Sequence, residues 1–349
     1  MALPGPVLAL DVGATKTIVA AVSGMPEEGL RPLRPPVHFA TPRPPEAFLA
    51  ALERAAAQAL PAGVPAAAVG IGVPGPLDAR RGIVEFSTNL GWRDLPLADL
   101  VSASFGGIPT VIEDDANTGA LGEAIAGAGR GADPFVYLPL GTGLGSGVIV
   151  GGRILAGAHG AGGEVGHMAV HDRNGPRCNC GRRNCVEAWC SGIGLARRAR
   201  EVWPARSLPD GTPAPRDAAG IFALARLGNQ EASALVARAQ HAFAIGIAAL
   251  LGSLDPAVVS VGGSVGLAEP RFTRAAFQEA TRLVHWAVGR RVRLLRPRLG
   301  GRSVLAGAAV LGVRALQAHD QRIDGTPDAH DRSSVARRPA IAGPTGQAG

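Results

Sequence analysis

Residues 7–22, VLALDVGATKTIVAAV, contain two apolar, β-branched runs separated by the glycine-containing segment GATKT. This pattern predicts two antiparallel strands joined by a short turn. Residues 135–150, FVYLPLGTGLGSGVIV, repeat the arrangement, with strands expected at 135–140 and 147–150 around a glycine-rich turn. The repetition predicts a protein with two similar halves.

Both glycine turns are candidate phosphate-binding sites. Glycine lets backbone amides approach phosphate oxygens closely, and the hydroxyls of Thr15, Thr17 and Thr142 could donate to the same oxygens. Asp11, at the end of the first apolar run, could hold a hydrated magnesium ion. Neither turn ends in the Gly-Lys-Ser/Thr of a P-loop, and GTGLGSG opens no βαβ unit with a ribose-binding acid. The two turns together indicate another nucleotide-binding fold.

The remaining chain alternates between strand-like and helical segments, which is typical of an α/β protein. Its 349 residues suit two domains, each with its own core. We expect strands at 7–11, 17–22, 69–73, 110–113 and 258–261, and helices at 45–60, 193–202, 218–227, 230–254, 272–287 and 304–318. The polar tail, rich in proline and glycine, is expected to be disordered.

Composition argues against several classes of protein. The net charge is +7 and the pI is near 10.4, but the arginines are scattered and no basic run is interleaved with aromatic residues. We therefore expect no nucleic-acid partner. The chain has no uninterrupted apolar run of about eighteen residues, and its N-terminus lacks the basic region of a signal peptide. We expect a cytoplasmic protein with no membrane partner.

Asp114 and Asp115 stand where an expected strand runs into an expected helix, within EDDANTGALGE, residues 113–123. A carboxylate at such a corner can accept the proton of a hydroxyl that attacks phosphorus. Helix capping is the alternative, since Asp at a helix start is common and stabilising. We expect one of the pair to cap the helix, and the crowding of two acids and Asn117 leaves a functional role equally open.

All four cysteines lie in one short segment that also contains a histidine. Cys178, Cys180 and Cys185 follow His167 at spacings that three thiolates and one imidazole can use to close a tetrahedron around zinc. Cys178 and Cys180 are too close in sequence to bridge each other without strain. We expect a structural zinc site, with Cys190 outside it as a small buried apolar residue.

Several ordered motifs together resemble the ROK family of bacterial sugar kinases and sugar-responsive repressors. They are DVGATKT, GVPGPLD, NLGW, EDDANTGALGE, GTGLGSGVIVGGRILAGAHGAGGEVGHMAV and CNCGRRNCVEAWCSG, and the resemblance covers most of residues 7 to 315. The resemblance implies an α/β protein with the two-domain, actin-like and ribonuclease-H-like ATPase fold. A sugar would bind in the interdomain cleft, with ATP between the two glycine loops. The expected domains are 1–118 plus 306–320, and 119–305 with the zinc-binding loop, followed by a disordered tail at 321–349.

The resemblance also implies roles for individual residues. Asp115 is the expected catalytic base. Expected sugar contacts are Gly75, Asn89, Asp114, Glu164, His167 and Glu187. Expected nucleotide and magnesium contacts are Asp11, Gly13, Thr15, Lys16, Thr17, Gly141, Thr142, Gly143, Gly262 and Gly263. In the family the histidine gives one ring nitrogen to zinc and the other to the sugar, so that the metal fixes the imidazole.

Three positions depart from the family pattern. Asp114 replaces the usual Asn, Asn184 replaces a glycine before the last zinc-ligating cysteine, and Ser146 replaces a glycine in the second phosphate loop. Asn tolerates positive φ better than most residues, so the change at Asn184 is acceptable. None of these changes removes the base or a zinc ligand.

The resemblance leaves several functions to choose from. We expect ATP-dependent phosphorylation of the primary hydroxyl of a hexose, with glucose preferred and a homodimer as the assembly. Kinases of N-acetylglucosamine or N-acetylmannosamine, fructokinases and the use of polyphosphate as donor remain alternatives. A sugar-sensing transcriptional regulator is the alternative of another class, but repressor members carry a winged helix-turn-helix ahead of a body that here begins near Asp11.

Overall fold

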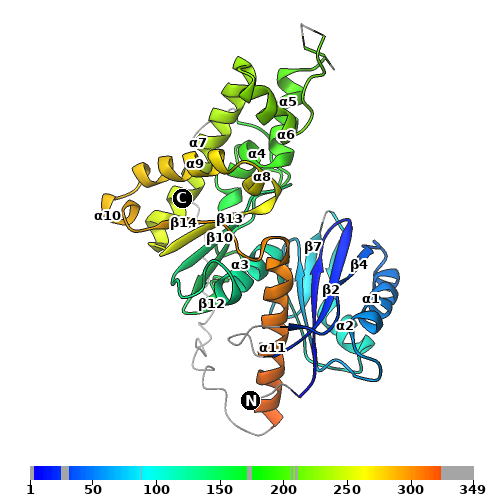
Figure 1. Cartoon of the computed structure of the whole chain (residues 1–349). Helices are drawn as coiled ribbons and strands as arrows, with labels where there is room; N and C mark the ends of the chain where they lie inside the picture. Colours follow the sequence, from blue (N-terminus) through cyan, green and yellow to red (C-terminus); the bar gives the residue numbers. More distant parts are fainter. Residues whose placement is uncertain are drawn as a thin grey trace, which may run out of the picture.

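The computed structural model describes residues 4–24, 31–87, 89–170, 175–205, 207–208 and 211–323. Two β-sheets form the centres of two domains, one above the other in Figure 1, with helices α3 and α11 at their junction. The expected disordered tail lies outside the described residues from position 324 onward.

The first sheet has the order β3-β2-β1-β5-β9, with β4 paired to β2. β1 and β2 are the antiparallel hairpin expected at residues 7–22, and β1, β5 and β9 run parallel. The strands are β1 (Val7–Val12), β2 (Lys16–Ser23), β3 (Arg31–Pro32), β4 (Val37–Ala40), β5 (Ala68–Val73) and β9 (Thr110–Asp114). A separate three-stranded sheet contains β6 (Leu77–Asp78), β7 (Ile83–Ser87) and β8 (Trp92–Leu95).

The second sheet repeats this design, as the two glycine hairpins predict. Its order is β12-β11-β10-β13-β14, in which an antiparallel pair is again continued by parallel strands. The strands are β10 (Phe135–Pro139), β11 (Gly147–Val150), β12 (Arg153–Ile154), β13 (Val258–Gly262) and β14 (Arg293–Leu295).

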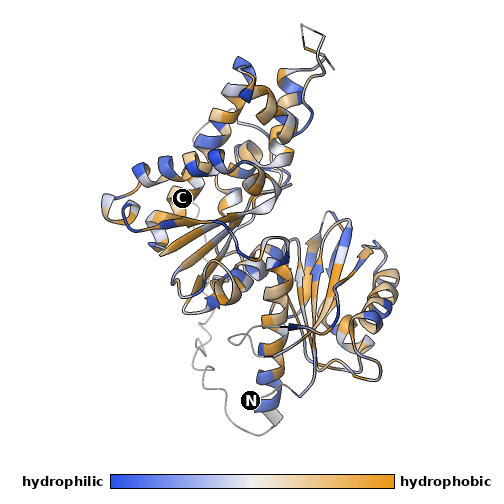
Figure 2. Cartoon of the chain, viewed as in Figure 1, coloured by the Kyte–Doolittle hydropathy of each residue, from blue (hydrophilic) through white to orange (hydrophobic). Residues whose placement is uncertain are grey.

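Alternate residues of each central strand face opposite layers, as the period of two requires. In β1, Leu8 and Leu10 pack with α1 (Pro45–Ala59) and α2 (Leu97–Ser104), whereas Val7 and Ala9 pack with α11 (Ser303–Ile323). These residues are almost completely buried. Figure 2 shows the resulting pattern, with hydrophobic strands inside and hydrophilic positions on outer helix faces.

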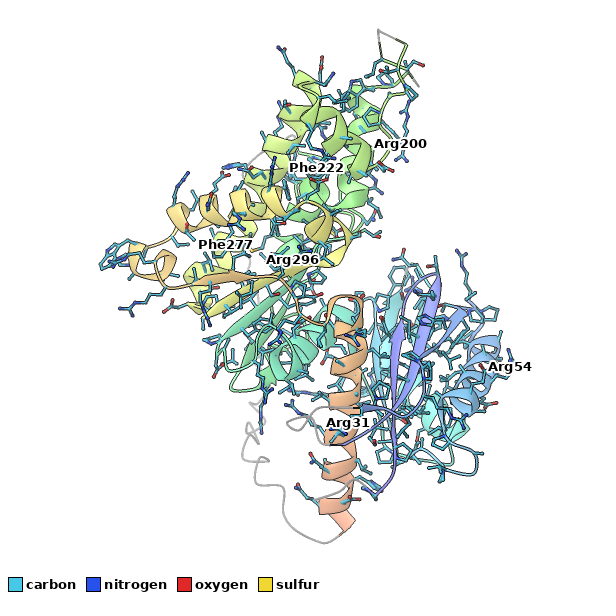
Figure 3. All side chains as sticks on the ribbon, in the orientation of Figure 1. Arg31, Arg54, Arg200, Phe222, Phe277 and Arg296 are labelled. Atoms are coloured by element: carbon cyan, nitrogen blue, oxygen red, sulfur yellow. The ribbon has the colours of Figure 1, made fainter. Side chains whose placement is uncertain are left out.

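The other helices cover the second sheet or connect its strands. They are α3 (Asp115–Ala126), α4 (Val186–Cys190), α5 (Gly192–Val202), α6 (Ala218–Arg226), α7 (Gln230–Leu254), α8 (Gly263–Ala268), α9 (Pro270–Leu283) and α10 (Trp286–Gly289), with 3₁₀ turns η1 (Val165–His167) and η2 (Gly300–Arg302). In Figure 3, Phe222 and Phe277 mark the buried layer of α6 and α9, and Arg54 and Arg200 mark the exposed faces of α1 and α5.

Two expected helices end differently in the structure. The helix expected at 272–287 is two helices, because Val284 is extended and the His285 side chain caps α10 by accepting from the Ala287 N–H. The final helix continues to Ile323, past the expected start of the tail at residue 321.

Helix α7 is long and apolar enough to cross a membrane by length and composition alone. Half of its apolar window is buried inside the protein, where Phe243, Ile247 and Leu251 join the core of the second domain. An apolar helix at the centre of a domain gives the same signal.

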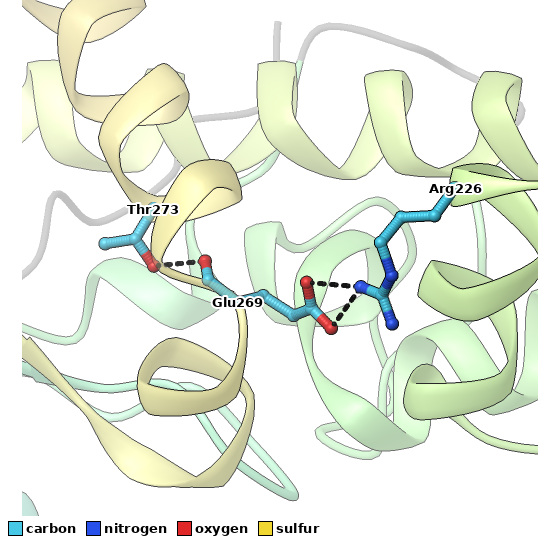
Figure 4. A network of polar contacts seen from close by, with 3 residues as sticks. All are labelled: Arg226, Glu269 and Thr273. Atoms are coloured by element: carbon cyan, nitrogen blue, oxygen red, sulfur yellow. Dashed lines mark hydrogen bonds and ion pairs between the residues drawn. The ribbon is translucent and has the colours of Figure 1, made fainter.

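A polar network joins the helices on the outside of the second domain. The Arg226 Nη1 atom at the end of α6 donates to both carboxylate oxygens of Glu269, at 3.0 and 2.9 Å. The Glu269 carbonyl accepts from the Thr273 hydroxyl at 3.2 Å, one turn into α9 (Figure 4). Because Arg226 is exposed, this ion pair orients the α8–α9 turn more than it stabilises the fold.

The described chain crosses between the two sheets twice. The first crossing is α3, which leaves β9 and leads to β10, and the second is the segment from β14 to α11. The helices of the two crossings pack on each other at glycines: a Cβ on Gly307 would lie 1.7 Å from the Thr118 carbonyl oxygen, and one on Gly122 would lie 2.2 Å from that of Ser303. The expected domain boundaries, 118/119 and 305/306, fall inside these two helices.

Candidate active site

Three parallel strands of the first sheet end at one edge, where the expected catalytic residues lie. Asp11 is near the end of β1, Gly75 follows β5, and Asp114 ends β9. In open α/β sheets, ligands bind outside the carboxyl ends of parallel strands. The topology therefore gathers residues that are up to a hundred positions apart in sequence.

Asp114 and Asp115 have different roles at this edge. Asp114 is the N-cap of α3, and its Oδ1 accepts from the backbone N–H groups of Ala116 and Asn117 at 2.9 and 3.3 Å. This confirms that one of the pair caps the helix. Asp115 is the first residue of the helix rather than its N-cap, and its carboxylate also interacts with the Ala116 N–H.

The acids at this edge influence one another strongly. Burial raises the pKa of the Asp115 carboxyl; the Ala116 N–H opposes this rise and Glu164 adds to it. Burial followed by repulsion from Asp115 raises the pKa of Asp11 to about 6, against the lowering effect of Lys16. Glu164 comes from the second domain, so groups of both domains act on Asp115. A carboxyl with a raised pKa at the edge of a sheet is a good candidate for a general base.

The first glycine turn is held by the neighbouring segment as well as by itself. The Gly13 N–H donates to the Lys16 carbonyl at 3.0 Å, and the Thr41 hydroxyl donates to the Gly13 carbonyl at 2.8 Å. The Thr17 hydroxyl is fully buried and lies 2.9 Å from that of Thr41. Thr15 and Lys16 are exposed at the tip. The tip residues are therefore available to a ligand, whereas Thr17 supports the turn from inside.

The carbonyl groups of the second glycine turn face the start of α5. The N–H groups of Gly192 and Ile193 donate to the carbonyls of Gly141 and Thr142 at 2.8 and 3.1 Å. Within the described residues, the N–H groups of Thr142 and Gly143 have no protein partner. Free amides on a fixed glycine turn are what an anionic phosphate requires.

Gly262 and Gly263 are fixed against the second turn. The Leu140 N–H donates to the Gly262 carbonyl at 3.0 Å, and a Cβ on Gly263 would lie 2.3 Å from the Leu140 carbonyl oxygen. Gly263 also has a φ of +77°, so glycine is required there on two grounds. This contact places the expected adenosine turn beside the expected phosphate loop.

The four expected zinc ligands lie together. Their donor atoms are all within 4.8 Å of one another; Cys178 Sγ is 3.7 Å from His167 Nδ1, and Cys180 Sγ is 3.6 Å from Cys185 Sγ. Ligand atoms at about 2.3 Å from a tetrahedral zinc are separated by about 3.8 Å. The Cys3His set fits a structural zinc ion, and Cys190 is fully buried outside it, as expected.

The backbone of the cysteine loop explains why the ligand atoms lie so close together. The Cys178 N–H donates to the Arg182 carbonyl at 2.8 Å, and Gly181 turns the chain with a φ of +87°. Asn184 has a φ of +70°, the conformation for which Asn is a suitable replacement of glycine, and its Oδ1 accepts from the Trp189 indole N–H at 2.7 Å. With Nδ1 facing the sulfurs, His167 keeps Nε2 for a second partner.

Two of the expected sugar contacts, Gly75 and Asn89, lie next to strands of the small three-stranded sheet. Gly75 has a φ of +120°, and a Cβ there would lie 2.5 Å from the Phe86 carbonyl oxygen, so it packs against β7. Asn89 is exposed on the turn that follows β7. Neither residue forms a hydrogen bond with the acids at the sheet edge among the described residues.

Comparison with known proteins agrees with this arrangement. The model of the ROK family matches residues 7–315. The chain belongs to the ROK family. Its two domains therefore have the actin-like and ribonuclease-H-like fold that the sequence motifs implied.

Several relatives of this chain within the ROK family are glucokinases, and others are xylose repressors. The glucokinase of Thermotoga maritima is 41% identical over 206 residues, 57% of this chain and 64% of the relative, so the chain spans a little less than two thirds of that protein. The Streptomyces coelicolor glucokinase is 33% identical over 88% of this chain and 97% of its own length. The Streptomyces griseus ROK glucokinase, solved with glucose and AMPPNP, has a TM-score of 0.70 and 32% identity, and the match covers 89% of this chain and all of that one.

Sequence reasoning missed three supporting residues of this ROK site. Thr41 locks the first turn, Tyr137 lies against Gly262, and Glu123 joins the two crossings between domains. Glu123 stands in the quoted stretch EDDANTGALGE, but only the fold shows which segment it contacts.

Proposed function

We propose that the protein transfers the γ-phosphoryl group of ATP to the primary hydroxyl of a hexose, with glucose as preferred substrate. The position of Asp115 carries the proposal most directly. It is the acid of the 114–115 pair that does not cap the helix, and its carboxyl interacts with acids of both domains.

In this reaction Asp115 accepts the proton of the sugar hydroxyl as its oxygen attacks the γ-phosphorus. The bond from that phosphorus to the bridging oxygen breaks, and ADP leaves with the electron pair. The free N–H groups of Thr142 and Gly143 are placed to stabilise negative charge on the phosphate oxygens. Magnesium, held near Asp11, would neutralise the remaining charge of the nucleotide.

The second domain supplies the groups that orient the sugar. His167 uses Nδ1 toward the cysteines, so Nε2 can bind a sugar hydroxyl, and Glu164 lies close enough to interact electrostatically with it. The proposed zinc ion has a structural role, because its ligand set leaves no open position for water or phosphate. It would fix the imidazole ring against the substrate.

The alternatives differ in substrate more than in chemistry. N-acetylhexosamines or fructose could occupy the same site, and polyphosphate could replace ATP. A regulator without enzymatic activity would not need a general base at Asp115 together with two phosphate turns. The homodimer and the cytoplasmic location stay predictions.

A coupled assay of ADP release over a panel of hexoses and N-acetylhexosamines tests the proposal. We expect turnover with ATP and magnesium, highest with glucose. If binding of a sugar is detected by calorimetry but none is phosphorylated, the kinase proposal is wrong and a sensor is favoured.

A further inference from the structure

Glu123 is a carboxylate with no exposed surface, located on the last turn of α3. Burying an ionised carboxylate is costly unless several donors surround it. Four donors do so here: the N–H groups of Ala128 at 2.8 Å, Arg298 at 3.0 Å and Leu299 at 2.9 Å, and the Ser303 hydroxyl at 2.7 Å. Among the described residues, no ion pair includes Glu123.

These donors belong to both connections between the domains. Ala128 follows α3 in the first crossing, whereas Arg298, Leu299 and Ser303 belong to the second. A single side chain therefore binds the backbone of two segments that are far apart in sequence. Glu123 and Arg298, for example, are separated by 175 residues. Such bonds strongly limit how far the two crossings can move relative to each other.

The packing around Glu123 allows little adjustment. Gly122, the preceding residue, touches the Ser303 backbone so closely that a Cβ would lie 2.2 Å from its carbonyl oxygen. On the other side, a Cβ on Gly127 would lie 2.0 Å from Glu123 Oε2. The carboxylate is thus held by close backbone contacts as well as by hydrogen bonds.

The same cluster reaches the expected nucleotide turn. Ser303 also interacts with the Tyr137 side chain, and a Cβ on Gly262 would lie 2.5 Å from the Tyr137 hydroxyl oxygen. At the other end of α3, eight residues before Glu123, stands Asp115. At a rise of about 1.5 Å per residue, the two carboxylates are about 12 Å apart along the helix.

We propose that Glu123 is a positioning residue, which clamps the two interdomain crossings together so that α3 presents Asp115 to the substrate at a fixed angle. The proposal rests on the proposed kinase function. It assigns Glu123 no contact with sugar or nucleotide; its effect on turnover passes through the orientation of α3. A misplacement of about 1 Å can lower a rate about a hundredfold, so a small loss of alignment is sufficient.

The test compares E123Q, which keeps the size of the side chain but turns an amide N–H₂ toward the donors, with S303A, which removes one donor. For E123Q we expect kcat to fall at least about tenfold, while the KM for glucose changes less than about threefold. S303A should show the same split with a smaller loss. In the double variant the losses should be clearly less than additive, because both changes break one cluster.

D217A is the matched control. Asp217 is also a carboxylate that accepts a backbone N–H, that of Gly220 at 2.8 Å, but it caps α6 far from either crossing. We expect D217A to lower thermal stability without changing kcat. If E123Q or S303A shows the kcat of the parent at a temperature where it is folded, or if D217A lowers kcat as much, the positioning role is overturned.

Amide hydrogen exchange gives a readout that does not depend on activity. In the parent, the N–H groups of Ala128, Arg298 and Leu299 should exchange slowly, and in E123Q they should exchange faster while α7 is unchanged. Rapid exchange in the parent overturns the clamp. If the parent phosphorylates no sugar, the kinase function and the role in turnover both fail; an active parent with an equally active E123Q removes only the role of Glu123.

Discussion

Glu187 accepts the backbone N–H of Leu144 through Oε2 at 3.0 Å, which joins the helix after the cysteine loop to the second glycine turn. Its other oxygen lies 3.5 Å from Cys178 Sγ. One residue expected to contact the sugar thus also links the zinc-ligand cluster to the proposed phosphate loop. We infer that sugar binding and nucleotide binding are coupled through this side chain.

This link predicts that E187Q weakens binding of both substrates. In E187Q the amide can offer its oxygen to the Leu144 N–H only by turning its N–H₂ toward the Cys178 sulfur, so the charge and the geometry of the contact with the zinc-ligand cluster both change. We expect the KM values for glucose and for ATP each to rise several-fold. Steady-state kinetics with each substrate varied in turn checks this, and an unchanged KM for ATP would refute the coupling.

Asp115 should be indispensable for turnover and dispensable for binding. In D115N the proton acceptor is lost while the side chain keeps its size, so we expect kcat to fall by about 100-fold to 10,000-fold. Glucose affinity, measured by calorimetry, should change little. Activity close to that of the parent would remove Asp115 from its proposed role.

The pH dependence of kcat should report the environment of Asp115. The base must be ionised, and burial together with Glu164 raises its pKa above the ordinary value of 3.8. Activity should therefore be lost, as the pH falls, at a higher pH than for an unperturbed aspartate. In E164Q the repulsion is absent, so the acid limb of the kcat profile should move to lower pH; no movement would exclude Glu164 as a cause.

Zinc content should depend on Cys180 and be independent of Cys190. C180S removes one of four ligands, so we expect loss of most of the metal and a higher KM for glucose, because His167 is no longer fixed. C190A changes a buried cysteine outside the cluster and serves as the control. Metal analysis should find about one zinc per chain in the parent and in C190A; equal zinc in C180S would contradict the assigned ligand set.

The glycine contact between α3 and α11 should be sensitive to a single methyl group. A Cβ on Gly307 would lie 1.7 Å from the Thr118 carbonyl oxygen, so G307A should lower the free energy of unfolding by about 1–3 kcal/mol. Nothing lies within 4 Å of a Cβ built on Gly301, a few residues away, and G301A should change stability by less than about 0.5 kcal/mol. Denaturant unfolding measures both values. Equal stabilities would show that the helices can separate freely.

Local patterns were sufficient for much of the site. The two glycine hairpins, a helix cap from the 114–115 pair and the His167–Cys185 ligand spacing each depend on neighbours close in sequence, and the structure places them as expected. The break between α9 and α10 was missed, because capping by the His285 side chain competed with a continuous apolar pattern. Thr17 was expected to contact the phosphate. Its hydroxyl is instead buried against Thr41, a contact that depends on a segment distant in sequence.

The amino-acid sequence by itself determined the elements, their repeated order and the residues able to bind phosphate or zinc, since these follow from periodicity and short spacings. Tertiary structure alone decided which distant groups meet. Glu123 and Leu299 are separated by 176 residues, and Leu144 and Glu187 by 43, yet each pair is hydrogen-bonded. Such contacts form only when two sheets and their crossings pack to completion, because the polar partners of a buried carboxylate are chosen by the fold around it.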